Sequence, residues 1–538
     1  MSTVSTISTP GHTLATSVQS VLRRIEEWTD RLAPAAAVLI VLLFAVWAWF
    51  GSREIRLQFD ELLEISAANA PTSNQVLSFL ASGVDFNPPL SHFAIRGSTS
   101  LLGNTELAMR LPAFLGVVAL LICLYIFVSQ RLSRSLGIVA MLLILCLPVR
   151  DYAIQARPYG MVLGFSGLAL VLYRYAIPPR HSVFAMLGLA ICTAALVASH
   201  YYAILVVGVL FAAELFRIWL SKRVDWVLLA CFAVPPAIVL FLLRDAVKQQ
   251  RQVLTHYFAR GNLLSFDHGY DVFDMDPLVY CVALVLIAGI LALRSGSAER
   301  PALAGAQPPH ELVLAIGLLL LPVIGALFTQ FVTHAYVPRY FLPASLGLAI
   351  CLCYVASIFS RSIPGLTVIL LLSLSLGFGK ALMQEVSRPP EALPQIGALI
   401  AEQTPLLFDT PGTYAQVYHY FPSLRDNLWV IADPSASLRY RNYDTDDRIM
   451  LALAKNGGAQ TISLSSAARK WPHFRLIPRS ADYIWALKCV LEAGSEVKVA
   501  HPFGSSNFIF DVTVPATGLA QVDACAQIPA PPLAGNIP

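Results

Sequence analysis

The sequence APAAAVLIVLLFAVWAWFG occupies residues 33–51 and contains no charged side chain. A helix of about 20 such residues crosses the hydrocarbon core of a bilayer. In lipid, a helix also satisfies its backbone hydrogen bonds internally, which an open strand does not. Similar runs recur along the chain, so we predict about eleven transmembrane helices. They lie at roughly residues 33–51, 107–129, 135–149, 159–177, 183–199, 202–220, 227–243, 277–293, 311–331, 341–359 and 366–383.

The composition of the whole chain agrees with a membrane protein. Of its 538 residues, 56% are hydrophobic and only 13% are charged, and the mean hydropathy is +0.64. Soluble domains carry about 25% charged residues, so an ordinary cytosolic enzyme is excluded. The net charge of +4 gives no indication of nucleic-acid binding. The predicted fold class is therefore a polytopic α-helical membrane protein.

Basic residues predict how the chain crosses the membrane. Residues 1–32 form a polar segment that carries Arg23, Arg24 and Arg31 just before the first apolar run. Positively charged flanks stay on the cytoplasmic side, so we expect a cytoplasmic N-terminal segment. Every second loop after it is also short and basic. An odd number of spans in the membrane domain 33–383 then places the rest of the chain outside the cytoplasm.

The region after the spans, residues 384–527, predicts an extracytoplasmic α/β domain. Short apolar segments alternate there with segments of helical spacing, as in α/β layer folds. The expected strands lie at 405–410, 428–432, 461–464, 496–500 and 507–514. This region also contains Cys489 and Cys525, and an oxidising compartment would permit a disulfide between them without requiring one. Residues 528–538 are rich in Pro and Ala and predict a flexible tail.

Polar motifs gather in the predicted outer loops, whereas the cytoplasmic loops are mostly tight. The first outer loop, residues 52–106, is long and holds two of these motifs; the others begin or precede later spans. Function is therefore expected to face outward. The motifs are Phe59-Asp60-Glu61, Asn87-Pro88-Pro89-Leu90, Asp151-Tyr152-Ala153-Ile154-Gln155-Ala156-Arg157-Pro158-Tyr159, His200-Tyr201-Tyr202 and Pro338-Arg339-Tyr340-Phe341.

In this order, the motifs resemble those of the integral-membrane GT-C glycosyltransferases that use polyprenyl-phosphate sugars. The most similar branch contains protein mannosyltransferases, the lipid A aminoarabinose transferase and rhizobial lipopolysaccharide transferases. The resemblance covers residues 33 to about 360. It implies transfer of a sugar from a polyprenyl-phosphate carrier to an extracytoplasmic glycan, lipid or protein, in the inner membrane of a bacterium.

The resemblance also implies roles for individual residues. Asp60 matches the family's first-loop Asp, the general base that takes the acceptor's proton during inversion at the anomeric carbon. Glu61 would orient Asp60 or the acceptor. The leaving phosphate is already anionic and needs no general acid, so Arg157 and Arg339 would bind its oxygens instead. The other implied pocket residues are Asn87, Asp151, Gln155, Tyr159, His200, Tyr201 and Tyr340.

Two positions depart from the family pattern. Asn87 stands where the family often has His or Lys, and Gln155 stands where it usually has Glu. These changes remove a phosphate ligand and a metal or acceptor ligand, although Asp151 could replace the second. The motifs establish no cofactor with certainty, and they are compatible with a bound divalent metal ion. The loop 244–276 offers candidate ligands, although such side chains are more often simply solvated: His256, Asp267, His268, Asp271, Asp274 and Asp276.

Each assignment has a simpler alternative. The first-loop carboxylates can solvate a helix end, the two arginines can snorkel at the membrane interface, and the aromatic residues can anchor the ends of spans. For the whole protein, the alternatives are a lipid-linked sugar transporter or flippase and a catalytically lapsed GT-C-like binding subunit. Transporters usually contain internal repeats and polar helices at mid-membrane, and the sequence shows no clear repeat.

Overall fold

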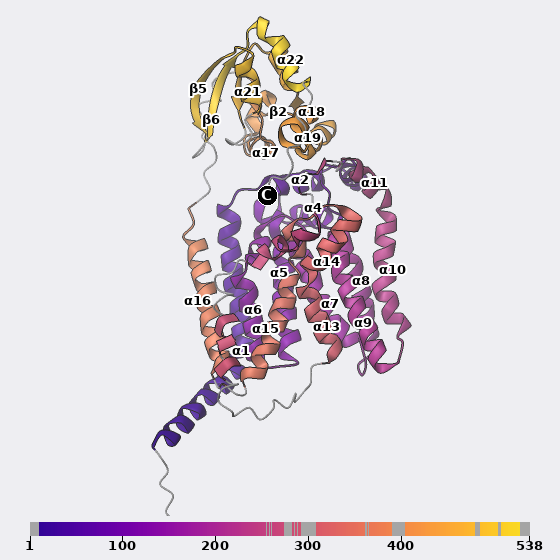
Figure 1. The fold of residues 1–538 in the computed structure, drawn as a ribbon, viewed down its shortest axis with the longest axis vertical. Helices are drawn as coiled ribbons and strands as arrows, with labels where there is room; N and C mark the ends of the chain where they lie inside the picture. The colour runs from indigo at the N-terminus through magenta and orange to yellow at the C-terminus, as the bar shows by residue number, and fades with distance from the viewer. Residues whose placement is uncertain are drawn as a thin grey trace, which may run out of the picture. The chain divides into compact units, whose positions relative to one another are not determined.

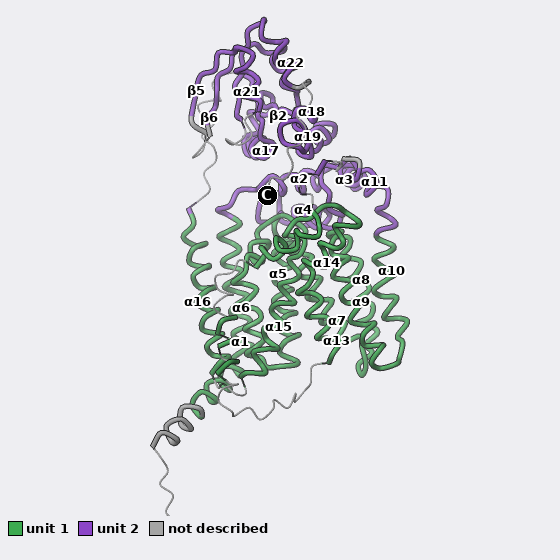
Figure 2. Tube along the Cα trace, viewed as in Figure 1, with its two compact units in different colours: residues 1–52, 110–239, 261–388 green, residues 53–109, 240–260, 389–538 purple. Residues whose placement is uncertain are grey.

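A computed structural model divides the chain into two compact units (Figure 2). Unit 1 comprises residues 1–52, 110–239 and 261–388, and unit 2 comprises residues 53–109, 240–260 and 389–538. The structure describes residues 10–253, 256–257, 259, 261–273, 282–284, 286–287, 289–291, 308–360, 363, 365–389, 404–478, 485–503 and 507–527. Most of the predicted span 277–293, the loop residues Asp274 and Asp276, and the predicted tail 528–538 lie outside these described residues.

Unit 1 is built from α-helices that run side by side (Figure 1). Short 3₁₀ turns connect several of them, including η1 (Pro148–Ile154), η2 (Tyr201–Ala203) and η7 (Pro338–Phe341). The helices are α1 (Pro10–Glu54), α5 (Glu106–Ser129), α6 (Arg134–Cys146), α7 (Tyr159–Ala176), α8 (Val183–Ser199), α9 (Ile204–Ser221), α10 (Trp226–Leu242), α13 (Pro309–Leu319), α14 (Leu321–Phe328), α15 (Ala344–Ser360) and α16 (Leu366–Val386), of which α1, α5 and α10 extend into unit 2.

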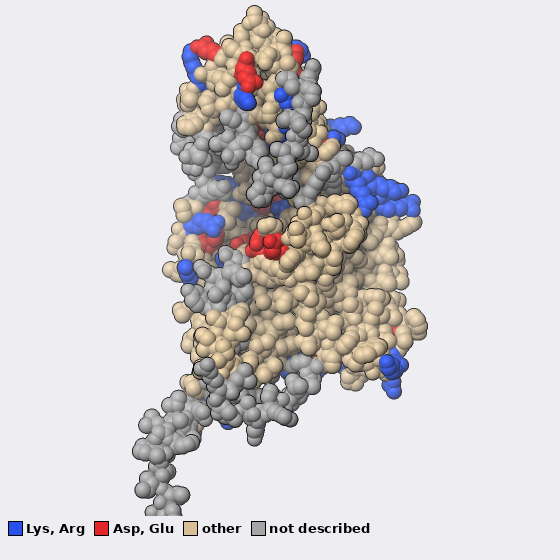
Figure 3. Space-filling model, viewed as in Figure 1, with Lys and Arg blue, Asp and Glu red and all other residues tan. Residues whose placement is uncertain are grey.

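Several of these helices are suited to a bilayer. Among the described residues, four helices are long and apolar enough to cross a membrane, or up to seven if each bent pair counts as one span. Large apolar side chains are exposed on their flanks, such as Phe184 and Leu376, and uncharged atoms cover most of the visible flank (Figure 3). The chain is thus mostly helical and membrane-embedded, and the span count of about eleven stays a prediction.

Proline accounts for two sharp bends that hydropathy alone does not reveal. The axes of α6 and η1 differ by 72°, and the axis of α13 differs by 62° from that of the segment Leu321–Thr333, which begins with α14. Pro148 begins η1, and Pro322 lies in the first turn of α14. Proline lacks a backbone N–H and therefore interrupts the helical hydrogen-bond ladder. The first bend leads the chain into the loop that carries Arg157.

Glycine lets α5 and α7 touch backbone to backbone. A Cβ atom built on Gly160 would lie 2.4 Å from the Ala113 carbonyl oxygen, and one on Gly116 would lie 2.2 Å from the Gly160 carbonyl oxygen. Any larger residue would therefore push the helices apart. Small residues at such crossings are the usual means of close packing in membranes. This contact fixes the start of α7, where Tyr159 lies.

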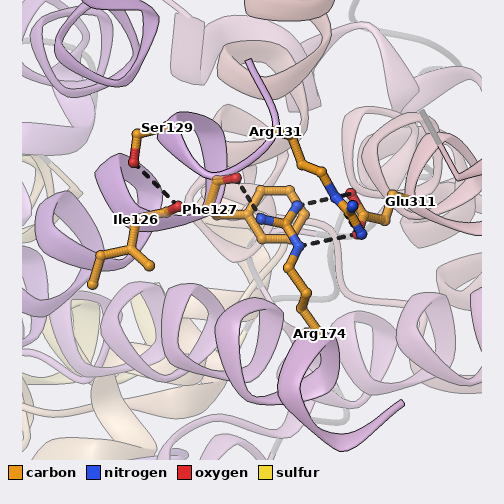
Figure 4. Close-up of polar contacts among 6 residues, drawn as sticks. All are labelled: Ile126, Phe127, Ser129, Arg131, Arg174 and Glu311. Carbon is orange, nitrogen blue, oxygen red and sulfur yellow. Dashed lines mark hydrogen bonds and ion pairs between the residues drawn. The ribbon is translucent and has the colours of Figure 1, made fainter. Parts of the chain in front are cut away.

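A buried ion cluster ties the ends of three helices together within unit 1 (Figure 4). Glu311 of α13 accepts hydrogen bonds from Arg174 of α7, at 2.7 Å, and from Arg131 just after α5, at 2.8 Å. The Arg174 guanidinium also lies 3.6 Å from the centroid of the Phe127 ring. Removing Glu311 would leave the buried Arg174 without its counter-charge, so the cluster stabilises the packing of these helices.

Unit 2 contains a six-stranded sheet with the strand order β3-β2-β1-β4-β6-β5. The first four strands in this order are parallel, and the last two are antiparallel to their neighbours. The strands are β1 (Leu406–Phe408), β2 (Leu428–Ile431), β3 (Thr461–Ile462), β4 (His473–Ile477), β5 (Glu496–Phe503) and β6 (Asn507–Thr513). The helices among them are α17 (Pro411–Tyr420), α18 (Pro434–Arg441), α19 (Thr445–Lys455), α20 (Leu464–Lys470), α21 (Trp485–Glu492) and α22 (Leu519–Gln527).

The first outer loop packs against this sheet and its helices. Its own helices are α2 (Phe59–Ala68), α3 (Ser73–Ala81) and α4 (Leu90–Leu102). Leu63 of α2 and Phe79 of α3 share a hydrophobic core with Phe408 of β1. The Tyr420 hydroxyl of α17 accepts a hydrogen bond from the Leu57 amide and donates one to Glu106. Both ends of the loop are therefore held by the same tyrosine.

A disulfide closes the other side of the sheet. Cys489 of α21 is bonded to Cys525 of α22, with their Cα atoms 5.9 Å apart. Both belong to a second hydrophobic core together with Phe474 of β4. Of the two states that the sequence left open for this pair, the structure has the paired one.

Candidate active site

Two arginines from distant parts of unit 1 meet at one tyrosine. The Arg339 Nε atom donates a hydrogen bond of 3.0 Å to the Tyr159 hydroxyl. The guanidinium carbons of Arg157 and Arg339 lie 5.8 Å and 5.9 Å from the centroid of the Tyr159 ring. Arg157 is 8% exposed and Tyr159 is 4% exposed. The structure thus brings the two predicted phosphate-binding residues together on a buried aromatic ring.

Local backbone structure explains how these three side chains are presented. Pro158 caps α7, so Tyr159 is the first residue of that helix and Arg157 lies just outside it. Pro338 begins the short turn η7, which carries Arg339. Proline is favoured in the first turn of a helix because the backbone N–H that it lacks would have no helical partner at that position. Each arginine therefore stands next to a proline that lies at the start of a helix or turn, in the sequences Arg157-Pro158 and Pro338-Arg339.

Aromatic rings extend the cluster away from the arginines. The ring centroids of Tyr159 and His200 are 5.4 Å apart, and those of His200 and Tyr340 are 4.7 Å apart. Tyr202 continues the row, with its ring 4.6 Å from that of Tyr340. The Tyr202 amide donates to the Nδ1 atom of His200 at 3.3 Å, which fixes the imidazole. Tyr202 was not among the predicted pocket residues, although it belongs to the same His-Tyr-Tyr motif.

The other predicted pocket residues of unit 1 lie in or next to the turns η1 and η2. The Gln155 carbonyl accepts a hydrogen bond of 2.8 Å from the Arg157 amide. Asp151 pairs with its neighbour Arg150 at 3.3 Å, and its side chain is 46% exposed. Tyr201 is half-buried in η2. The backbone of Gln155 therefore helps to place Arg157, and Asp151 is more exposed and pairs with its neighbour Arg150.

The predicted first-loop residues belong to unit 2 and are described there by themselves. Asp60 is half-buried in the first turn of α2. Glu61 is buried, and its Oε2 atom accepts a hydrogen bond of 2.9 Å from the Gln58 amide, as part of a capping box. The Asn87 Nδ2 atom donates to the Asp85 carboxylate at 2.9 Å. Glu61 therefore has a clear structural task at the start of the helix that carries Asp60.

The acidic loop 244–276 gives little support for a metal site in its described part. His268 and Asp271 approach to 3.6 Å, and their side chains are 70% and 67% exposed. His256 lies 3.9 Å from Asp444. The His268–Asp271 pair is an ordinary surface ion pair of small energetic weight, and Asp444, which is buried, lies outside the loop.

Chemically, the Arg157–Arg339–Tyr159 cluster suits an anion that has two or more oxygens. Each guanidinium presents donors in a planar fork that matches phosphate oxygens. A neighbouring row of tyrosine and histidine rings provides apolar faces with polar edges. Positive charge beside aromatic surface is what a phosphate joined to a sugar or a lipid chain requires.

Comparison with known proteins gives one family match and several matches to solved structures. A family model described as dolichyl-phosphate-mannose-protein mannosyltransferase matches residues 87–241. Among solved structures, ArnT from Cupriavidus metallidurans bound to undecaprenyl phosphate gives a TM-score of 0.54 at 14% sequence identity, over 90% of this chain and 99% of that chain. The chain has a GT-C glycosyltransferase fold. The resemblance predicted from the outer-loop motifs is therefore confirmed.

Further matches extend the comparison. The apo state of the same ArnT gives a TM-score of 0.52 at 14% identity, over 89% of this chain and 98% of that chain. The oligosaccharyltransferase of Archaeoglobus fulgidus gives a TM-score of 0.43 at 11% identity, over 86% of this chain and 73% of that chain. None of the curated proteins compared with the chain matches it. The GT-C fold and the family model together support a glycosyltransferase in general terms.

Proposed function

We propose that the protein is an inverting membrane glycosyltransferase that takes its sugar from a polyprenyl-phosphate carrier. The observation that carries this proposal is the meeting of Arg157 and Arg339 at Tyr159, in a chain that shares its fold with ArnT. The solved ArnT structure contains undecaprenyl phosphate. Two guanidinium groups held at the same ring are protein groups well suited to the phosphate of such a carrier.

In this proposal the arginines act on the leaving group. The donor phosphate carries one negative charge while the sugar is attached, and it gains negative charge as the bond to the sugar breaks. Donors that are already in place stabilise such developing charge without having to reorganise. The hydrogen bond from Arg339 to Tyr159 and the burial of Arg157 hold both cations in advance. The electrostatic stabilisation that the two arginines give the phosphate therefore increases from the bound donor to the transition state.

Asp60 supplies the base. Its carboxylate takes the proton of the acceptor hydroxyl while the hydroxyl oxygen forms a bond to the anomeric carbon. The bond from that carbon to the phosphate oxygen breaks, and polyprenyl phosphate leaves with the bonding electron pair. Attack opposite the leaving group inverts the anomeric centre. Glu61 stabilises the first turn of α2, which carries Asp60, through its capping hydrogen bond.

The acceptor is an extracytoplasmic glycan, lipid or protein, and the membrane is the inner membrane of a bacterium. The disulfide between Cys489 and Cys525 supports an extracytoplasmic place for the sheet, because disulfides persist in oxidising compartments. The parts of unit 2 that flank α2 would then contribute to acceptor binding.

The test uses the purified full-length protein in lipid nanodiscs. It is incubated with a panel of polyprenyl-phosphate sugars and a crude envelope acceptor, and the release of free polyprenyl phosphate is measured. Release that depends on both donor and acceptor is the expected result. Lipid binding without release from any donor would favour a lapsed binding subunit. Movement of intact donor across proteoliposome membranes would favour a flippase.

A further inference from the structure

Three buried side chains with metal-binding atoms converge inside the first outer loop. Glu64 lies on α2, Asp85 lies in the segment before the paired prolines, and His92 lies on α4. Their exposed fractions are 0%, 5% and 0%. One ligand atom from each residue lies within 4.8 Å of the other two. All three belong to unit 2, so the group depends on the packing of this unit alone.

The orientation of two of these side chains is set by neighbouring groups. Asn87 donates two hydrogen bonds to the Asp85 Oδ1 atom, one from its side-chain Nδ2 at 2.9 Å and one from its backbone N–H at 3.3 Å. The other oxygen of Asp85, Oδ2, lies 3.2 Å from the His92 Nε2 atom. On the far side of the imidazole, the Ser91 hydroxyl lies 3.5 Å from Nδ1. Outer contacts of this kind orient the ligands in metal sites of proteins.

The donor atoms of the group suit a metal cation. One imidazole nitrogen and carboxylate oxygens from two residues form a set that Zn²⁺ commonly accepts.

We propose that Glu64, Asp85 and His92 bind a divalent transition-metal ion, with Zn²⁺ as the best match. Around a tetrahedral ion, bond lengths of about 2.0–2.2 Å place ligand atoms about 3.3–3.6 Å apart. The ligand atoms now lie within 4.8 Å of one another, so the widest pair has to close by up to about 1.5 Å. A tetrahedral zinc ion with three protein ligands keeps its fourth position for water, as in catalytic zinc sites.

The ion would connect α2 to α4 through the loop between them. Glu64 lies four residues after Asp60, so the two share one face of α2. Fixing Glu64 therefore fixes the helix that presents Asp60. This site also gives Asn87 a task that its departure from the family pattern left unexplained, because Asn87 holds the Asp85 carboxylate toward His92. Metal binding itself does not depend on the proposed sugar transfer.

The first measurement is the metal content of the full-length protein, purified with a tag that contains no histidine and without chelators. Elemental analysis is expected to find about one Zn²⁺ per chain. After removal of metal with EDTA, the thermal unfolding midpoint should fall, and added Zn²⁺ should restore it. Titration calorimetry of the metal-free protein with Zn²⁺, Mn²⁺ and Mg²⁺ then gives the preference among the three ions.

Substitutions locate the site. Glu64→Gln and Asp85→Asn preserve side-chain shape and should weaken Zn²⁺ binding by more than about 100-fold, and Asn87→Ala should weaken it by about 10- to 100-fold. Asp426→Asn and His501→Asn alter exposed residues of the same unit and serve as matched controls with unchanged affinity.

Two results would overturn the proposal. One is wild-type protein that contains no metal, fails to bind the three ions, and unfolds at the same temperature with and without EDTA. The other is Zn²⁺ binding that is unchanged in Glu64→Gln and Asp85→Asn. If those variants do not fold, zinc X-ray absorption of the wild type decides, because an ion without one imidazole and oxygen neighbours excludes this site. Loss of sugar transfer alone bears on the proposed function and leaves these metal measurements unaffected.

Discussion

Arg339→Gln tests the proposed phosphate-binding role of the arginine cluster. Arg339 donates to Tyr159, and the Arg157 guanidinium lies at the ring of the same tyrosine, so the substitution removes one of two cations from the cluster. A hydrogen bond to a charged group contributes about 1.5–3 kcal/mol. Since about 1.4 kcal/mol corresponds to a tenfold change in Kd, affinity for undecaprenyl phosphate should fall by about 10- to 150-fold. Arg339→Lys retains the charge but loses the planar fork, so its loss should be smaller.

The assay is equilibrium binding of undecaprenyl phosphate to the purified protein in nanodiscs. Arg180→Gln is the matched control, because Arg180 also lies over a tyrosine ring, 4.1 Å from the centroid of Tyr175, but is exposed. The control should bind the lipid as the wild type does. If Arg339→Gln and Arg180→Gln both bind with wild-type affinity, the arginine cluster does not hold the donor phosphate.

Three further predictions concern packing, covalent structure and pH. In thermal unfolding, Gly160→Val should destabilise the fold by about 1–3 kcal/mol, because its side chain meets the α5 backbone. Gly379→Val should not destabilise it, because no atom lies within 4 Å of the added Cβ atom. Replacing Cys489 and Cys525 by serine opens a crosslink between residues 36 positions apart and should cost about 4 kcal/mol in denaturant unfolding. Burial and a nearby arginine lower the pKa of His419. The unfolded chain therefore binds a proton at this residue more readily than the folded protein does, and the free energy of unfolding falls as the pH drops below about 6.5. His419→Gln should therefore shrink the fall in unfolding midpoint between pH 7.5 and pH 5.5.

Hydrophobic patterns in the sequence predicted most of the architecture. The strands expected near residues 406, 428, 461, 496 and 507 are all present. Strand β4 was missed because the buried Arg475 interrupts its apolar pattern. That charge is paired with Asp511 of β6 at 2.9 Å, a partner that only the sheet register supplies. The number of spans was less accessible, since a hydropathy profile does not show a 62° bend inside an apolar run.

The candidate site was predicted residue by residue but not as an assembly. Motif resemblance selected Arg157 and Arg339, yet nothing in their spacing shows that both would reach Tyr159. Their meeting depends on the close approach of α5 and α7 and on the turn η7. The group of Glu64, Asp85 and His92 escaped notice because its spacing matches no metal motif. In the sequence, Glu64 occupies what looks like an ordinary polar position of an amphipathic helix, and only the folded loop buries it close to Asp85 and His92.

The general base is the centre of the account, and Asp60→Asn tests it most directly. The substitution changes one oxygen to an amide nitrogen and removes the capacity to accept the acceptor's proton. The measurement is release of polyprenyl phosphate by the variant and the wild type, with lipid binding determined in parallel. We expect the variant to bind the donor lipid with wild-type affinity and to lose turnover by at least about 100-fold. Turnover at the wild-type rate would contradict the assignment of Asp60 as the base.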